Sequence, residues 1–183
     1  MADDVSAEDW ITLGVALLQR EGPASLEVAQ LCARLGCELA DFHHHFAEKG
    51  TFALAIARHW ADHAEAAARE ARRGKKPSER LLAMLALGVE ADVNLERGIR
   101  ALAADHEPVA ALVRAADDRH ELVLTTDLAA VYGLGAEEAQ EFGRVLHALH
   151  VAAMSRPADE ARTWGAGPAR AITALLGSNF PIE

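Results

Sequence analysis

Aromatic side chains are scarce in this sequence and make up 5% of its 183 residues. So few rings argue against a large ligand pocket lined by stacked aromatic side chains. No apolar run approaches the roughly 18 uninterrupted residues that a membrane span requires. The N-terminus also lacks the basic region and apolar run of a signal peptide. These absences predict a cytoplasmic protein without a membrane partner.

Cysteine is nearly absent as well. The only two, Cys32 and Cys37, lie close together in the sequence. Because a reducing cytoplasm disfavours disulfides, we interpret both as buried thiols of a folded core. A redox-active pair is the alternative that the sequence leaves open.

Positive charge is in short supply. The formal net charge is −10, and residues 1–50 hold three cations against nine acids, which leaves −6 in that segment. Proteins that bind DNA do so chiefly by neutralising phosphates with Lys and Arg. The only basic stretch, residues 58–80, is interpreted as a solvated face and turn. Charge therefore weighs against DNA binding by the first 50 residues.

Catalytic motifs are missing too. The sequence contains no nucleophile elbow, no glycine loop that would cradle a phosphate and no His-Glu-x-x-His pattern. We therefore expect no enzymatic activity and no cofactor.

The histidines are grouped, which raises the question of a metal site. Consecutive helical residues point about 100° apart, so the three histidines at 43–45 cannot converge on one ion. His59 and His63 have the spacing of a solvent-side pair on one helix. His147 and His150, three positions apart, either contact a ligand together or lie at a dimer seam. We expect no bound metal.

Hydrophobic residues are abundant, at 51%, and recur at helical spacing. Glycine and proline fall mostly between these periodic segments, where they end helices. The pattern predicts an all-α protein. The expected helices cover about residues 6–20, 25–35, 37–44, 48–73, 77–104, 108–132, 136–155 and 158–176.

The stretch from Ser25 to Lys49 forms two short helices around a tight turn in this interpretation. Ser25 is expected to cap the first helix, and Gly36 to end it in a left-handed conformation. The second helix is expected to direct Leu39 and Phe42 inward. A helix, a glycine turn and a short helix are typical of a helix-turn-helix.

From Trp10 to about Trp60 the chain resembles the DNA-binding domain of the TetR family of bacterial one-component regulators. The resemblance rests on the order and spacing of an apolar first helix, a capped second helix, a Gly turn and a short aromatic helix. In this sequence these features are Trp10–Gly22, Ser25–Leu35, Gly36-Cys37, Phe42-His43-His44-His45-Phe46 and Lys49. It implies a three-helix head at residues 1–50 on a larger helical regulatory and dimerisation bundle at residues 51–183.

The family's DNA contacts, carried over to this sequence, imply a set of exposed positions in and around the second short helix. These are Ser25, Leu39, Ala40, Asp41, His43, His44, His45 and Lys49. Asp41 stands where a Thr is common, and His43 where a Tyr is common. An Asp accepts a hydrogen bond from cytosine but repels phosphates, and a histidine gains charge below about pH 6.5.

The family also implies a homodimer built on its last long helices. Gly143 and its small neighbours are expected to permit close approach of a partner helix. The expected dimer residues are Phe142, Val145, Leu146, Leu149, Ala153, Ile172 and Leu175.

An effector pocket, in this resemblance, opens inside the C-terminal bundle. Polar groups that interrupt apolar helix faces mark its candidate residues. These are Asn94, His120, Thr125, Tyr132, Arg144, His147, His150 and Trp164.

Two functions follow from the sequence. The first is a dimeric transcriptional regulator that binds a palindromic operator on double-stranded DNA and responds to a small-molecule effector. The second is a protein of the same fold whose acidic head has lost operator binding and which binds a ligand or another protein. The intact helix-turn-helix pattern favours the first function, and the charge of the head favours the second.

Overall fold

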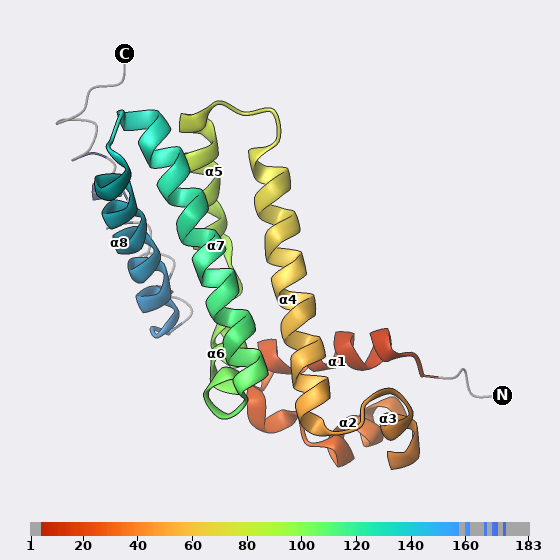
Figure 1. The fold of residues 1–183 in the computed structure, drawn as a ribbon. Coiled ribbons are helices and arrows are strands. Elements are labelled where there is room, and N and C mark those ends of the chain that lie inside the picture. The colour runs from red at the N-terminus through yellow and green to blue at the C-terminus, as the bar shows by residue number, and fades with distance from the viewer. Residues whose placement is uncertain (1–4, 158–159, 162–166, 168–169, 172–173, 175–183) are drawn as a thin grey trace. The chain divides into compact units, whose positions relative to one another are not determined.

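The computed structural model describes residues 5–157, 160–161, 167, 170–171 and 174. Within these residues every regular element is a helix, so the all-α prediction is confirmed (Figure 1). No helix in the described ranges is long and apolar enough to cross a membrane. Most of the expected helix over 158–176 lies outside the described residues, and so do three expected site residues, Trp164, Ile172 and Leu175.

The chain divides into two compact units. The first comprises Met1–His63 and Asp92–Val113, and the second comprises Ala64–Ala91 and Arg114–Glu183. This division differs from a boundary at residue 50, because the first unit takes in a later segment of the chain.

The first unit begins with α1 (Ala7–Arg20), followed by the 3-10 turn η1 (Pro23–Ser25) and the helices α2 (Val28–Leu35) and α3 (Leu39–His45). Ser6 and Asp9 form the predicted capping box of α1, in which each accepts from the other's backbone N–H. The hydrogen bonds from Ser6 lower the pKa of the Asp9 carboxyl. The helix α4 (Lys49–Arg72) begins in this unit, with Phe52, Ile56 and Trp60 buried.

A later segment completes the first unit. The predicted single helix over 77–104 is wrong: the structure has α5 (Pro77–Glu90) and α6 (Val93–Asp105). The break occurs because the Asp92 side chain caps α6 by accepting from the backbone N–H groups of Asn94 and Leu95. The helix α6 packs against α1, and a Cβ at Gly98 would lie 3.1 Å from Leu18. In α4 the Trp60 indole donates to Glu96 of α6 at 2.8 Å.

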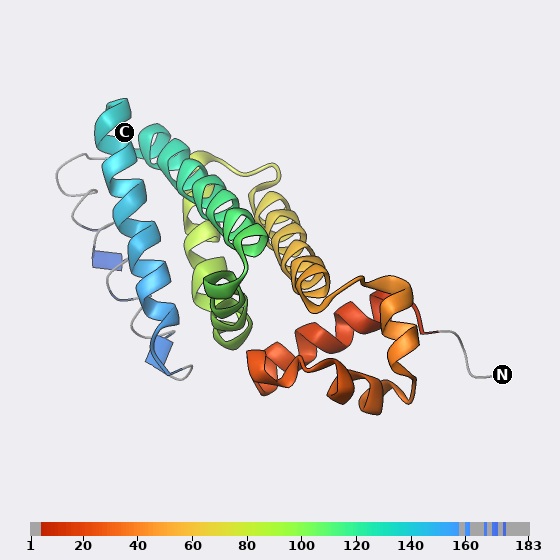
Figure 2. The same cartoon turned by 60° about the horizontal axis from the view of Figure 1, so that its bottom comes forward.

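The second unit contains the end of α4, α5, most of α7 (Glu107–Tyr132) and α8 (Ala136–Met154). Figure 2 shows α8 running alongside α7. The two helices approach closely at Gly143, where a Cβ would collide with Thr125 of α7. Gly143 therefore serves close packing within the chain. The apolar core of this unit comprises Leu81, Met84, Leu124, Leu128, Leu134, Ala139 and Leu146.

A buried charge cluster links three helices of the second unit. Asp127 of α7 is fully buried. Its two carboxylate oxygens accept from Arg72 at 3.1 Å and from Arg80 at 2.8 Å. A carboxylate in a low-dielectric interior needs such partners, because an unpaired buried charge is costly. Asp127 therefore ties the last turn of α4 and the first turn of α5 to α7.

Asp127→Asn is expected to destabilise the protein. It keeps the shape of the side chain but leaves two guanidinium groups without their counter-charge. We expect a loss of about 3 kcal/mol, at the low end for a broken buried pair, because both arginines retain some contact with water. Thermal unfolding, monitored by circular dichroism, measures this loss of stability.

The matched control is Glu70→Gln. It breaks the exposed pair between Glu70 and Arg73, whose atoms lie 2.9 Å apart, and should cost at most about 0.5 kcal/mol. Equal effects of the two substitutions would contradict the structural role of Asp127.

Candidate functional site

The helix-turn-helix forms in the first unit, as predicted. The helix α2 ends at Gly36, whose φ of 69° is the left-handed conformation that glycine adopts without strain. The backbone N–H of Cys37 donates to the Cys32 carbonyl at 3.1 Å and turns the chain back towards α2. The helix α3 starts two residues later, and the two helices lie beside each other (Figure 1).

Aromatic rings fix the position of α3. Phe42 is fully buried and makes edge-on contacts with Trp10 and Phe52, at ring-centroid distances of 5.3 and 5.6 Å. Phe46, one turn later, packs on Phe42 at 5.4 Å and on Phe52 at 5.0 Å. Such pairs add to the free energy that simple burial of the rings provides. The inner face of α3 is therefore held by α1 and α4.

Ser25 does not cap α2, so that prediction is wrong. The residue lies in η1, is buried, and donates its hydroxyl to the Gly22 carbonyl at 2.6 Å. The helix α2 begins only at Val28, because the 3-10 turn after Pro23 takes up the intervening residues. The serine hydroxyl thus stabilises the turn before the helix.

The outer face of α3 carries Leu39, Ala40, His43 and His44, all exposed. Leu39 is 56% exposed, so its predicted inward orientation is wrong. It is the first residue of α3, and the aromatic cluster buries the helix only from Phe42 onward.

Two other side chains of α3 form hydrogen bonds to backbone groups of the first unit. Asp41 accepts from the backbone N–H of Glu38 at 2.7 Å and so caps the start of the helix. His45 donates from Nε2 to the Val5 carbonyl at 2.7 Å. Neither side chain is as open to solvent as His43 and His44.

Two of the three cations in residues 1–50 form ion pairs with acids. Lys49, the first residue of α4, forms an ion pair with Glu27 at 2.5 Å. Arg34 of α2 pairs with Glu21 at 2.8 Å. Both pairs are solvent-exposed, so each is weak and open to competition by another anion. The sequence showed the excess of acids but not these partners, which come from distant positions.

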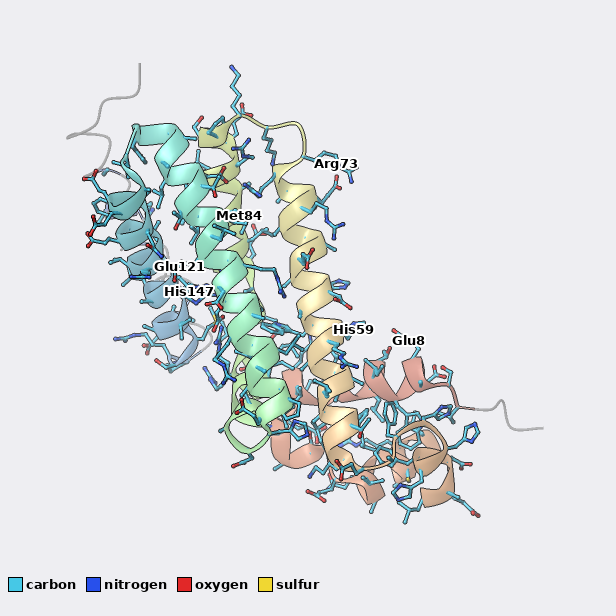
Figure 3. The ribbon with its side chains drawn as sticks, in the orientation of Figure 1. Glu8, His59, Arg73, Met84, Glu121 and His147 are labelled. Carbon is cyan, nitrogen blue, oxygen red and sulfur yellow. The ribbon has the colours of Figure 1, made fainter. Side chains whose placement is uncertain are left out.

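Three of the expected effector residues come together in the second unit. The rings of His120, His147 and His150 have centroids 5.3 to 6.3 Å apart. The Nε2 of His147 lies 3.6 Å from the carboxylate of Asp117. Figure 3 shows His147 on α8 and Glu121 on α7. The histidine pair at 147 and 150 is thus joined by a third imidazole from α7.

A small cavity adjoins this cluster. Its volume is about 40 Å³. His120 and His150 line it together with apolar side chains of α5, α7 and α8, including Met84 and Leu124. One liquid water occupies about 30 Å³, so the cavity as it stands holds no organic ligand.

The remaining expected effector residues are dispersed. Asn94 belongs to the first unit, where its side chain donates to the Gln19 carbonyl at 3.0 Å. Thr125 packs at the Gly143 crossing, and Arg144 forms an ion pair with Glu121 at 3.2 Å. Tyr132 is half-buried at the end of α7, and burial raises the pKa of its phenol.

In the part of the chain that the structure describes, no group of three or more His, Cys, Asp or Glu side chains is arranged to hold a metal ion. The rings of His59 and His63 stack at a centroid distance of 5.7 Å, and His59 also lies 3.9 Å from Glu8 (Figure 3).

The expected dimer residues of α8 point in different directions. Leu146 and Ala153 are buried inside the second unit and contribute no surface. Val145 is 47% exposed, and Phe142 and Leu149 are half-buried.

Comparison with known proteins gave matches in structure alone. Neither the family models nor the curated proteins that were searched match the sequence. A transcriptional regulator from Rhodococcus sp. Rha1 is 21% identical, with 97% of this chain and 99% of that chain covered and a TM-score of 0.79. A TetR-family regulator from Agrobacterium tumefaciens is 25% identical, with 87% of this chain and 92% of that chain covered and a TM-score of 0.67. Reduced NemR from E. coli is 18% identical, with 93% of this chain and 96% of that chain covered and a TM-score of 0.74. The likeness spans nearly the whole chain and confirms the fold that the resemblance implied.

Gly36→Ala tests the turn between α2 and α3. A Cβ there meets no atom within 4 Å, so the cost is only that of holding a non-glycine residue at positive φ, about 1–2 kcal/mol. Urea unfolding measures it. Gly135→Ala is the control: it is equally open but has a φ of −62°, and it should lose less than half as much. Equal losses would contradict a role for the left-handed turn.

Proposed function

We propose that this chain, which has the fold of the TetR-family transcriptional regulators, is a cytoplasmic regulator that binds a palindromic operator as a homodimer. The observation that carries the proposal is the outer face of α3. A helix held by buried rings on one side presents Leu39, Ala40, His43 and His44 to solvent on the other. This is the arrangement by which helix-turn-helix proteins place a recognition helix in the major groove.

The chemistry of these four residues suits base edges. Leu39 and Ala40 can contact thymine methyl groups, and an imidazole N–H can donate to purine acceptors. Asp41, by contrast, is removed from base reading in this proposal because it caps α3. The contact set inferred from the family therefore reduces to Leu39, Ala40, His43, His44 and Lys49.

Binding would have to overcome the charge of the head. Lys49 is the family's phosphate-binding lysine in this resemblance, yet Glu27 already holds its ammonium group. A DNA phosphate would compete with this carboxylate for the lysine, and the remaining acids would repel the backbone. We therefore propose moderate affinity with a strong dependence on salt.

Dimerisation is proposed through α8. Val145, Phe142 and Leu149 lie three to four positions apart, which places them along one helix face. Because Val145 is the most exposed of the three, it is the proposed centre of a two-fold contact, where it meets its own copy across the axis.

The proposed effector site is the cavity beside His120, His147 and His150. Ligand pockets typically have volumes of several hundred Å³, so binding here would require α5, α7 and α8 to separate. Such a ligand shifts the conformational equilibrium only if it prefers the widened state. Release of the operator would follow if that state places the two heads at the wrong spacing.

The runner-up is a protein of this fold that no longer binds DNA and acts as a ligand-binding or protein-binding module. The charge of −6 on residues 1–50 and the engagement of Lys49 and Arg34 favour it.

Fluorescence anisotropy against DNA from upstream of the protein's own gene separates the two functions. We expect saturable, sequence-dependent binding that weakens between about 50 and 200 mM salt, because phosphate contacts release counterions. His43→Ala with His44→Ala should weaken the sequence-dependent binding, because it removes two imidazole donors from the exposed face of α3.

Absence of binding to this DNA and to a random genomic pool would overturn the regulator function. It would leave the binding module as the conclusion.

Glu27→Gln is expected to tighten DNA binding. The substitution releases Lys49 and removes a repelling charge beside the proposed interface. We expect about three- to tenfold higher affinity and a salt slope steeper by about one, the value for one additional phosphate contact. Anisotropy titrations over a salt series measure both.

The matched control is Glu8→Gln. It removes the same charge from the head, but Glu8 lies beside His59, roughly 15 Å along α4 from Lys49. An equal gain from both substitutions would indicate a net-charge effect and contradict the specific role of Glu27.

A further inference from the structure

The two cysteines of this chain lie on either side of the turn between α2 and α3. Cys32 belongs to α2 and is buried, and Cys37 is the first residue after Gly36 and is half-buried. Both are free thiols. The proposed function makes no use of either sulfur.

The backbone turn keeps the two residues within bonding reach. The Cys37 N–H donates to the Cys32 carbonyl at 3.1 Å. Standard bond lengths then limit the separation of the two Cα atoms to roughly 7 Å. Disulfides join cysteines whose Cα atoms are about 4.4–6.8 Å apart. This hydrogen bond is that of a Schellman motif, in which the side chains at the positions of Cys32 and Cys37 commonly contact each other.

The sulfur atoms occupy the same small region. Cys32 Sγ donates to the Glu38 carbonyl at 3.6 Å, and Cys37 Sγ donates to the Cys32 carbonyl at 3.9 Å. Burial raises the pKa of the Cys37 thiol, and the neighbouring Cys32 sulfur and Asp41 raise it further. Cys37 therefore keeps its proton at neutral pH and reacts slowly with disulfides there.

We propose that Cys32 and Cys37 form an internal disulfide in the presence of a small-molecule disulfide, and that closing it weakens DNA binding by α3. The second part rests on the proposed function. The first part rests only on the turn.

The reaction is thiol–disulfide exchange in two steps. The half-exposed Cys37 loses its proton and attacks one sulfur of the small disulfide, which forms a mixed disulfide and releases one thiol. Deprotonated Cys32 then attacks the Cys37 sulfur, which forms the internal bond and releases the second thiol. The protein gives up two electrons and two protons, and the small disulfide takes them up.

Closure would disturb the start of α3. A disulfide has no S–H group, so both sulfurs lose the hydrogen bonds that they now donate to carbonyl oxygens. One of these carbonyls belongs to Glu38, which immediately precedes α3 and donates to the capping Asp41. Phe42 meanwhile keeps the middle of the helix in place. The N-terminal turn with Leu39 and Ala40 should therefore shift, while the protein stays folded.

The experiment uses the full chain in glutathione buffers of increasing disulfide content at about pH 8.5, where more thiolate is available. Intact mass after alkylation counts the free thiols. In the oxidised buffers we expect both free thiols to be lost with no glutathione attached to the protein, and both to return when a reductant is added. Operator affinity, measured on the same samples, should fall about tenfold, the loss expected for one good base contact.

Cys37→Ser is the control variant. With a single buried thiol it cannot close the bond, so oxidised buffer should leave its operator affinity unchanged. Its affinity under reducing conditions should match that of the unaltered chain, because Cys37 contributes no exposed face to α3.

The proposed bond would be overturned if both thiols remained alkylatable at every buffer ratio, or if the cysteines formed only mixed disulfides with glutathione. A closed disulfide with unchanged operator affinity would overturn its effect on α3. If the reduced protein binds no DNA, the proposed function and the effect on affinity both fail, and the thiol count still decides whether the disulfide forms.

Discussion

The burial of Phe42 is the constraint on which the candidate interface depends. Few aromatic residues are available, and the head uses four of them, Trp10, Phe42, Phe46 and Phe52, around a short helix. A helix as short as α3 is not stable alone in water. Its position comes from these ring contacts and from the Gly36 turn before it. The same anchoring leaves the opposite face of α3 open to solvent, which is the basis of the proposed recognition surface.

The acidic charge of the head opposes DNA binding by the exposed face of α3. A recognition helix gains most of its affinity from phosphate contacts, but this head carries an excess of acids. Lys49 and Arg34 are each bound to a glutamate from another part of the head. Because such exposed pairs are weak, they moderate the affinity without excluding it. Binding would then be sensitive to salt and to substitution of Glu27.

The interior of the second unit contains a charge cluster and a small cavity, and the two suit different roles. The cluster of Asp127 with Arg72 and Arg80 is closed, because each oxygen of the buried carboxylate meets a guanidinium group. The histidines at 120 and 150 line a cavity that has room for little more than a water molecule. The first arrangement suits structural support. The second is the site that we propose for a ligand, which would enter if the helices separated modestly.

The sequence by itself determined most of the helices, the Gly36 turn, the Ser6 cap and the family resemblance, because these depend on local spacing and backbone conformation. The tertiary structure decided which residues meet: α6 with α1, Glu27 with Lys49, and His120 with the histidines of α8. It also decided that Leu39 is exposed and that Ser25 is buried. Such outcomes depend on packing between distant segments, which no local pattern encodes.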